Sequence, residues 1–139
     1  MTQTALDNLS RIGQIKAEPR NASESVRLLE MARVSLADAR LPTLSMHGRF
    51  SSAYHAAHSA ALAALRWHGY RSENRFIVFQ CLVHTLGWAD EQWRILDAAH
   101  RKRNMAEYEG FLDVTDDEIA ELIKTVHVLI EDAAKLLAE

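Results

Sequence analysis

The segment from His100 to Gly110 holds the side chains best suited to chemistry. Three consecutive cations precede an asparagine there: Arg101, Lys102, Arg103 and Asn104. Positive charge near the end of a helix suits the negative end of the helix dipole, but the dipole does not explain Asn104, a mediocre helix former. Because a guanidinium beside an amide can bind a phosphate or the edge of a base, we expect Arg103 and Asn104 to form a binding site. The cationic residues expected to surround it are His100, Arg101 and Lys102.

Glu107 and Tyr108 extend this candidate site along the same helix. They lie four and five residues after Arg103, so we expect all three on one side of the last helical turns. A phenol there can hydrogen-bond to a ligand or stack on a base. An ion pair between Arg103 and Glu107 is the alternative, and it would weaken the cation.

Other groupings of reactive side chains are poorly supported. His55 and His58 lie three residues apart, but the carboxylates that would complete a metal site are scarce nearby. We therefore expect these histidines and Tyr54 to fill space between helices, and we expect no metal. Cys81 lies between Phe79 and Leu82 and should behave as a small buried hydrophobe. The sequence contains no glycine-rich phosphate loop and no Gly-x-Ser-x-Gly motif, so no cofactor is expected.

Helices must position all of these residues, because helical periodicity of apolar residues runs through the chain and strand signals are nearly absent. Pro19 and Pro42 fall between the expected helices. The longest helix is rich in alanine, so it can approach its neighbours closely and is expected at the centre of a bundle. The predicted helices run from about Ala5 to Ala17, Ser23 to Arg40, Ser45 to His68, Ser72 to Gly87, Asp90 to Glu107, and from a cap at Thr115 to the C-terminus.

The helices together predict an all-α fold, an antiparallel helical bundle of four to five core helices plus a short N-terminal helix. A length of 139 residues is that of one domain. We take residues 1–139 as this single domain, with 1–21 as the weak N-terminal helix and a linker. Thr115 and Glu118 have the spacing of a capping box, and Gly69 is placed for a left-handed helix end.

Composition excludes several classes of protein. With 48% hydrophobic and 25% charged residues, the chain is neither disordered nor collagen-like. No apolar run reaches the ~20 residues that a membrane-spanning helix needs. The N-terminus lacks the basic start and apolar stretch of a signal peptide, and one cysteine cannot form an internal disulfide. We therefore expect a cytoplasmic protein with no membrane contact.

Charge is unevenly distributed along the chain. The formal net charge is −3, yet residues 1–65 carry +2, residues 66–103 carry +3 and residues 104–139 carry −8. A net-acidic chain does not favour non-specific binding to nucleic acid. The basic middle still allows a local site for an anion, and the acidic end suits a protein partner.

The layout of the chain resembles the HEPN superfamily, small helical bundles found in toxin–antitoxin and defence systems. Over about residues 22–138, a long alanine-rich helix precedes two more helices, an Arg-Asn pair ends the penultimate one, and a long helix follows. The alanine-rich helix contributes Ala53, Tyr54, His55, Ala56, Ala57 and His58 to this likeness. The family motif is an Arg, a polar residue and a His about one and a half turns later. Arg103 and Asn104 match it, whereas Tyr108 stands in place of the His.

In HEPN ribonucleases the motif Arg and His of two subunits meet across a dimer cleft, where the His transfers protons on RNA. The resemblance therefore implies a homodimer that binds RNA or a nucleotide through Arg103, Asn104 and Tyr108, with cleavage lost or much reduced. The residues it places around the RNA are His100, Arg101 and Lys102. It also implies an antitoxin or nucleotidyltransferase partner, although Gly110 replaces the tyrosine that such partners modify. Three tryptophans favour a dimer, because one small core would not bury them all: Trp67, Trp88 and Trp93.

Two other functions remain open. An active, metal-independent endoribonuclease would use Tyr108 or His100 in place of the motif His. A non-catalytic adaptor would bind a protein partner through its acidic C-terminal helix, and Arg103 would then be structural.

Overall fold

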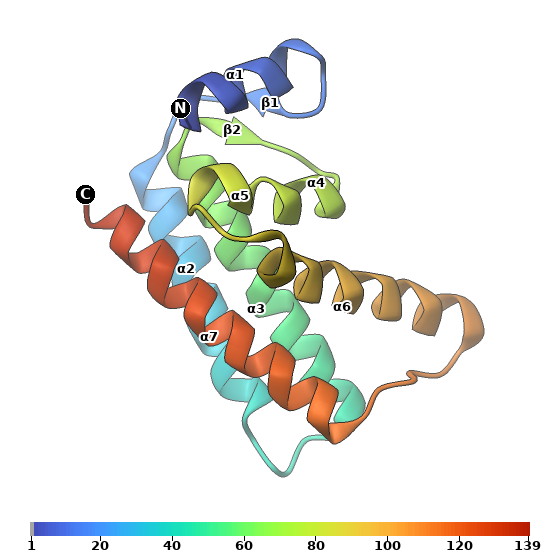
Figure 1. Ribbon diagram of the computed structural model, residues 1–139. Helices are drawn as coiled ribbons and strands as arrows, with labels where there is room; N and C mark the ends of the chain where they lie inside the picture. Colours follow the sequence, from blue (N-terminus) through green and yellow to red (C-terminus); the bar gives the residue numbers. More distant parts are fainter. Residues whose placement is uncertain (1) are drawn as a thin grey trace.

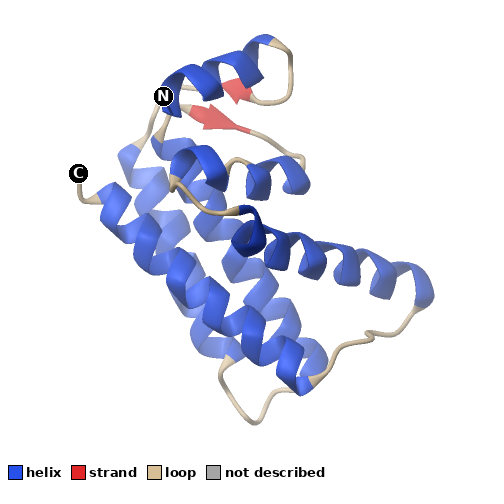
Figure 2. Cartoon of the chain, viewed as in Figure 1, coloured by secondary structure: helices blue, strands red, loops and turns tan. Residues whose placement is uncertain are grey.

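A computed structural model describes residues 2–139 and confirms the all-α fold. Three long helices form the body of the bundle: α2 (Ala22–Ala39), α3 (Met46–Trp67) and α7 (Asp116–Leu137). A short turn joins α2 to α3, and α7 packs against both of them, as Figure 1 shows. Helices make up most of the chain, and the described residues contain one small two-stranded sheet (Figure 2).

The alanine-rich helix α3 lies at the centre, as predicted. Its alanines from Ala53 to Ala64 are buried, and their small side chains let α2 and α7 approach its backbone closely. Ser45 caps its start by accepting a hydrogen bond from the backbone N–H of Gly48. Gly69 follows its end with a φ of +87°, which confirms the predicted left-handed turn.

Helix α6 (Asp90–Glu109) differs from the others because it leaves the body of the bundle. Its buried residues, Trp93, Leu96 and Ala99, all lie in its first half, and its C-terminal half projects away from the other helices (Figure 1). Residues 110–115 then return the chain to α7. There the predicted capping box forms, since the Thr115 side chain accepts from the Glu118 backbone and the Glu118 carboxylate accepts from the Thr115 backbone.

The N-terminal segment departs from the prediction. Helix α1 (Thr2–Arg11) ends well before Ala17, because Gly13 takes a φ of +82° and turns the chain. The following residues form β1 (Lys16–Ala17), which pairs in antiparallel register with β2 (Tyr70–Arg71), with Lys16 opposite Arg71. A long-range backbone pairing thus replaces the end of the predicted helix.

A buried arginine fixes this paired segment to the bundle. Arg66, at the end of α3, is 1% exposed. Its guanidinium donates to the Glu24 carboxylate at 2.5 Å and to the backbone carbonyls of Glu18 at 2.8 Å and Pro19 at 2.7 Å. Arg71 completes the network through ion pairs with the carboxylates of Glu18 and Glu24. These bonds satisfy the buried charge and hold the chain extended before α2.

The helix predicted from Ser72 to Gly87 is two short helices, α4 (Arg75–Gln80) and α5 (Leu82–Thr85). Asn74, rather than Ser72, caps α4 by accepting from the backbone N–H of Ile77 at 3.2 Å. Helix α4 packs against α3 and α6, whereas α5 packs against α1 and α3. The break at Cys81 lets each short helix bury its apolar residues against different neighbours.

The tryptophan argument for a dimer is wrong. Trp88 and Trp93 are 4% and 5% exposed, and their indole N–H groups donate to Asp132 and Asp90. Trp67 is half-buried beneath the guanidinium of Arg20, which lies 4.1 Å from the centre of its ring. One copy of the chain therefore accommodates all three rings.

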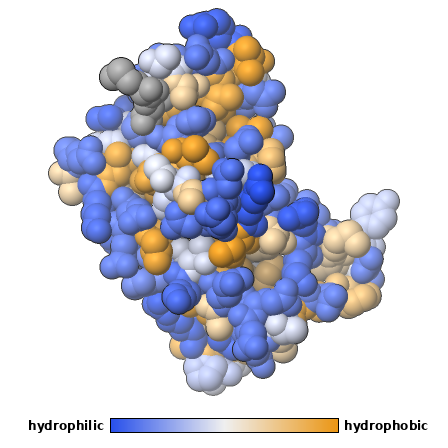
Figure 3. Space-filling model, viewed as in Figure 1, coloured by the Kyte–Doolittle hydropathy of each residue, from blue (hydrophilic) through white to orange (hydrophobic). Residues whose placement is uncertain are grey.

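Hydrophilic residues cover much of the face drawn in Figure 3, and apolar residues gather there in small patches. Within residues 2–139, each helix is too short or too polar to cross a lipid bilayer.

Candidate functional site

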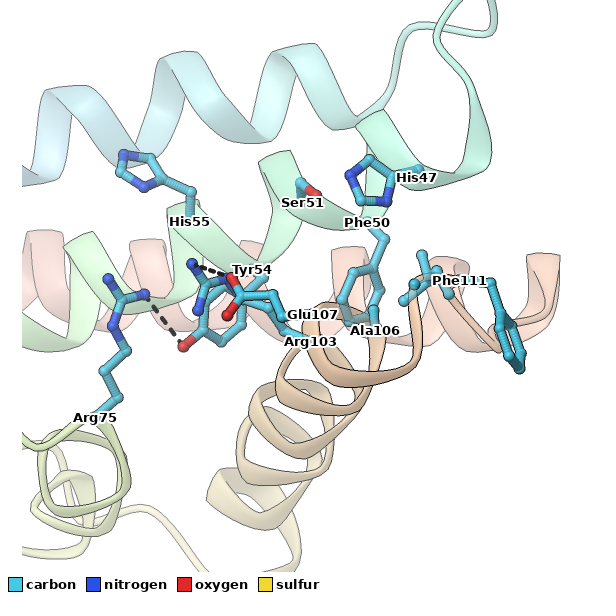
Figure 4. A pocket seen from close by; sticks show the side chains of 12 residues that line it. His47, Phe50, Ser51, Tyr54, His55, Arg75, Arg103, Ala106, Glu107 and Phe111 are labelled. Atoms are coloured by element: carbon cyan, nitrogen blue, oxygen red, sulfur yellow. Dashed lines mark hydrogen bonds and ion pairs between the residues drawn. The ribbon is translucent and has the colours of Figure 1, made fainter.

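A cavity of about 580 Å³ lies between the first half of α3, the start of α4 and the projecting end of α6. Figure 4 shows its lining from close by. The lining residues are His47, Phe50, Ser51, Tyr54, His55, Arg75, Arg103, Ala106, Glu107, Gly110, Phe111 and Leu112. Its volume is in the range of about 300–1,000 Å³ that is typical of small-ligand sites.

Helix α3 positions the central residue of this cavity, Tyr54. The Tyr54 side chain is 2% exposed, and its ring contacts Phe79 edge-on with the ring centres 6.2 Å apart. The His100 ring is nearly parallel to it, with the centres 6.1 Å apart and the planes 13° from parallel. Burial among these rings fixes the phenol, with its hydroxyl toward α4 and α6.

The Tyr54 hydroxyl joins groups from three helices. Arg75, the first residue of α4, donates from Nη1 to this oxygen at 3.2 Å, and Nδ1 of His100 lies 2.9 Å from it. Nε2 of His100 in turn lies 3.3 Å from the Asn104 amide nitrogen. When that amide donates to Nε2, the ring proton is on Nδ1 and donates to Tyr54, so the hydroxyl proton is left for a ligand. Rotating the amide by half a turn gives the other tautomer and reverses the Tyr54–His100 bond.

Two arginines bring positive charge to the same ring. The Arg103 guanidinium lies 5.3 Å from the centre of the Tyr54 ring, and that of Arg75 lies 5.5 Å from it. Arg103 also forms the predicted ion pair with Glu107, at 3.2 Å. Within residues 2–139, Arg75 has no carboxylate partner. Positive charge therefore exceeds negative charge in the cavity, and its least neutralised member is Arg75.

Two histidines near this cavity, His58 and His100, have a lowered pKa. Burial and the nearby Arg75 lower the pKa of His58 to about 4. Burial also lowers the pKa of His100, and Arg75 and Arg103 act in the same direction, while Asp97 opposes them. These shifts favour the neutral form of both imidazoles, so neither His58 nor His100 adds positive charge to the site at pH 7.

Of the residues predicted for the site, Arg103 and His100 meet at Tyr54. Asn104 is exposed and reaches the site only through His100. Arg101 lies 3.5 Å from Asp97 in an ion pair on its own helix. Lys102 bonds to the Asp113 carbonyl at 2.7 Å and to Glu118 at 3.1 Å. Both cations lie outside the cavity lining, and Lys102 joins α6 to the chain that returns to α7.

The prediction that Tyr108 shares one side of the helix with Arg103 is wrong. Tyr108 is 94% exposed and does not line the cavity, whereas Glu107 does. Five residues of an α-helix turn the chain by roughly 140° beyond a full turn, which moves Tyr108 off the face of Arg103. Within one chain, Tyr54 supplies the phenol that Tyr108 was expected to supply.

Sequence reasoning missed Tyr54 and Arg75 as members of the site. Tyr54 was expected only to fill space between helices, and Arg75 counted only as part of the basic middle of the chain. One local signal does point to Arg75: a cation in the first turn of a helix opposes the helix dipole, so another interaction has to favour it.

The structure also bears on metal and nucleophile chemistry. In the part of the chain that the structure describes, no three histidine, cysteine or acidic side chains are grouped to hold a metal ion. Cys81 is buried, as predicted, and burial raises the pKa of its thiol to about 11. A thiol of this kind is a poor nucleophile at neutral pH.

Comparisons with family models, with curated proteins and with solved structures found no match for this chain.

Proposed function

We propose that this chain is a HEPN-like domain that binds RNA or a nucleotide through the cavity around Tyr54. The observation that carries the proposal is the convergence of Arg75 and Arg103 on one buried tyrosine, inside a chain that is acidic overall. Two guanidinium groups and a phenol present several hydrogen-bond donors to one point, and a phosphate group accepts that many. A toxin–antitoxin or defence role in the cytoplasm belongs to the same proposal and rests on the family resemblance.

The chemistry of the cavity favours a phosphate over a carboxylate or a metal. Neutral His100 and the buried ring of Tyr54 exclude water from one side, which strengthens the attraction between Arg75 and an anion. Glu107 neutralises part of the Arg103 charge, so a ligand with more than one negative oxygen competes better for it. A terminal phosphate, which carries close to two negative charges at pH 7, has this property, whereas each backbone phosphate of a single strand carries one charge shared by two oxygens.

The proposal includes a homodimer. Tyr108, near the end of α6, is 94% exposed and directly follows Glu107, which lines the cavity. Burying its ring against a second copy would place this phenol close to a ligand bound there. Light scattering that finds a monomer at tens of micromolar protein would refute this part of the proposal.

Binding of labelled single-stranded RNA, measured by fluorescence anisotropy, tests the function. We expect binding that weakens with salt, and we expect Arg75→Gln and Arg103→Gln each to lower the affinity about tenfold or more, because each removes a charged hydrogen bond. Arg33→Gln is the matched control, since Arg33 is an exposed arginine of α2 paired with Glu30. If wild-type protein shows no salt-dependent binding at physiological ionic strength, the proposal fails.

The Tyr54–His100 contact favours one second candidate, a metal-independent endoribonuclease. In that reaction Tyr54 takes the proton of a ribose 2′-hydroxyl as its own proton passes to His100. The 2′-oxygen bonds to phosphorus, and the bond from phosphorus to the 5′-oxygen breaks. The 5′-oxygen then receives the proton back, leaving a 2′,3′-cyclic phosphate and a 5′-hydroxyl. His100 is the base for this route. Its Nδ1 lies 2.9 Å from the Tyr54 oxygen, and its lowered pKa keeps the imidazole unprotonated before the reaction.

Incubation with an RNA pool in EDTA tests this candidate. Cleavage by wild-type protein and by Tyr108→Phe, with loss in Tyr54→Phe and His100→Gln, is the result it requires. Intact RNA after long incubation at high protein concentration rejects it and leaves binding as the function.

A further inference from the structure

The proposed phosphate site occupies only one end of the cavity. Arg75, Arg103 and the Tyr54 hydroxyl converge at that end. At the other end the lining is mainly carbon, from Phe50, Ala106, Phe111 and Leu112. Figure 4 shows Phe50 and Phe111 on the side of the cavity away from Arg75. A ligand that fills the whole cavity needs an anionic group at one end and an apolar group at the other.

Phe111 is placed at the rim of the cavity by the turn that ends α6. Gly110 takes a φ of +83°, and the chain leaves the helix with Phe111 lining the cavity while its ring remains 63% exposed. The next residue, Leu112, packs against the hydrophobic core instead. Folding therefore leaves most of an aromatic ring exposed at the rim of a cavity that also contains two arginines, and an exposed ring at this place can stack on a planar ligand.

A polar side chain of α3, Ser51, lies between the two ends. It lines the cavity, and in Figure 4 it lies between His55 and His47 along the helix. Its hydroxyl can bond to the hydroxyls of a sugar. The order along the cavity is thus cationic, polar and then aromatic, which is the order of phosphate, ribose and base in a nucleotide.

We infer that the cavity binds one unstacked nucleotide, with its phosphate at Arg75 and Arg103 and its base against Phe111. The placement of the phosphate rests on the proposed function, and the placement of the base against Phe111 goes beyond it. A volume of about 580 Å³ accommodates one nucleotide but not a base-paired duplex, so the nucleotide is either free or an unpaired residue of a single strand.

Binding of a graded series of ligands tests the inference. Isothermal titration calorimetry is used to compare inorganic phosphate, ribose 5-phosphate, uridine and adenosine 5′-monophosphates, and short single-stranded RNA. Three variants accompany the wild type: Phe111→Ala, Arg75→Gln and the matched control Met105→Ala. Met105 is 53% exposed near the same end of α6 and lies outside the cavity lining, so its loss removes an exposed apolar side chain without changing the site.

We expect both nucleotides to bind about tenfold or more tightly than ribose 5-phosphate, because one stacked base contributes that much. Phe111→Ala should remove this difference and leave the affinity for ribose 5-phosphate unchanged, and Met105→Ala should change neither. Arg75→Gln should weaken all of these ligands. If RNA binds more tightly than the nucleotides and depends on Phe111 in the same way, the bound nucleotide belongs to a single strand. Equal binding identifies the free nucleotide.

Two results overturn the inference and are distinguishable from each other. If ribose 5-phosphate binds as tightly as the nucleotides and depends on Arg75, the placement of the base against Phe111 is wrong and the phosphate site stands. If no phosphate compound binds, or if Arg75→Gln has no effect, the proposed function fails together with the inference.

Discussion

Replacing Tyr54 by phenylalanine removes one oxygen atom from the centre of the site. That oxygen accepts a hydrogen bond from Arg75 at 3.2 Å and shares a second with His100 at 2.9 Å. The ring itself is buried against Phe79 and His100, so phenylalanine fills the same space. The substitution therefore tests the hydrogen bonds without creating a cavity.

The expected cost follows from these two bonds. A hydrogen bond contributes about 1 kcal/mol net, and one to a charged group about 1.5–3 kcal/mol. Arg75 and His100 are partly exposed, so in the variant water replaces part of the hydrogen bond that each loses with the Tyr54 oxygen. We expect the free energy of unfolding to fall by about 1–2 kcal/mol and the Tm to fall by about 3–8 °C.

Thermal unfolding followed by circular dichroism measures this loss, with Tyr108→Phe as the matched control because its phenol is 94% exposed. A double-mutant cycle with His100→Gln should give a coupling of about 1 kcal/mol, since each variant breaks the same bond. Affinity for phosphate should fall in Tyr54→Phe, because Arg75 loses the group that holds it in the cavity. A Tm unchanged in Tyr54→Phe, or lowered equally in Tyr108→Phe, would refute the proposed network.

Four further outcomes follow from the structure. Arg66→Met should lower the free energy of unfolding by about 1.5–3 kcal/mol in urea denaturation, because it removes the charged hydrogen bonds from Arg66 to the Glu24 carboxylate and to the carbonyls of Glu18 and Pro19. His58 has a folded-state pKa of about 4, against an ordinary value of 6.5. Its neutral form therefore stabilises the protein above pH 6.5, and this stability is lost as the pH falls from 6.5 toward 4. His58→Gln should flatten the dependence of Tm on pH between pH 6.5 and 4. Cys81 should resist iodoacetamide at pH 7.5 in the native protein and react after unfolding, as mass spectrometry would show. Thr115→Ala should cost about 1 kcal/mol in chemical denaturation, because it removes the cap of α7.

Local patterns predicted the long helices well. The spacing of apolar residues and the Thr115–Glu118 box predicted α7, and the alanines predicted a central α3. The prediction failed between Ile12 and Ala17, where helical periodicity continues in the sequence. There the chain instead pairs with β2, some 55 residues later, and bonds to the buried Arg66. Periodicity within a segment contains no information about such a distant partner.

The site was less predictable than the fold, because its members come from three helices. The Arg103–Glu107 pair is confirmed, since residues four apart on a helix meet whatever surrounds them. Tyr54 is separated by 21 residues from Arg75 and by 46 from His100. Only the packing of α4 and α6 against α3 brings these three together. Their side chains are ordinary residues of amphipathic helices when each helix is considered alone.

The distribution of charge explains why only part of the dense run of cations lines the cavity. In the run, Arg101 pairs with Asp97, and Lys102 pairs with Glu118 and bonds to the Asp113 carbonyl. Ion pairs within the chain therefore neutralise much of the positive charge of the run. Neighbouring cations on a helix repel one another, and nearby acids relieve that repulsion. Arg75 lies alone on its helix, with a tyrosine hydroxyl and no carboxylate as its partner among residues 2–139. A cation that the fold leaves without a countercharge beside a cavity keeps its attraction for an anionic ligand, and for that reason we assign the phosphate to Arg75 first.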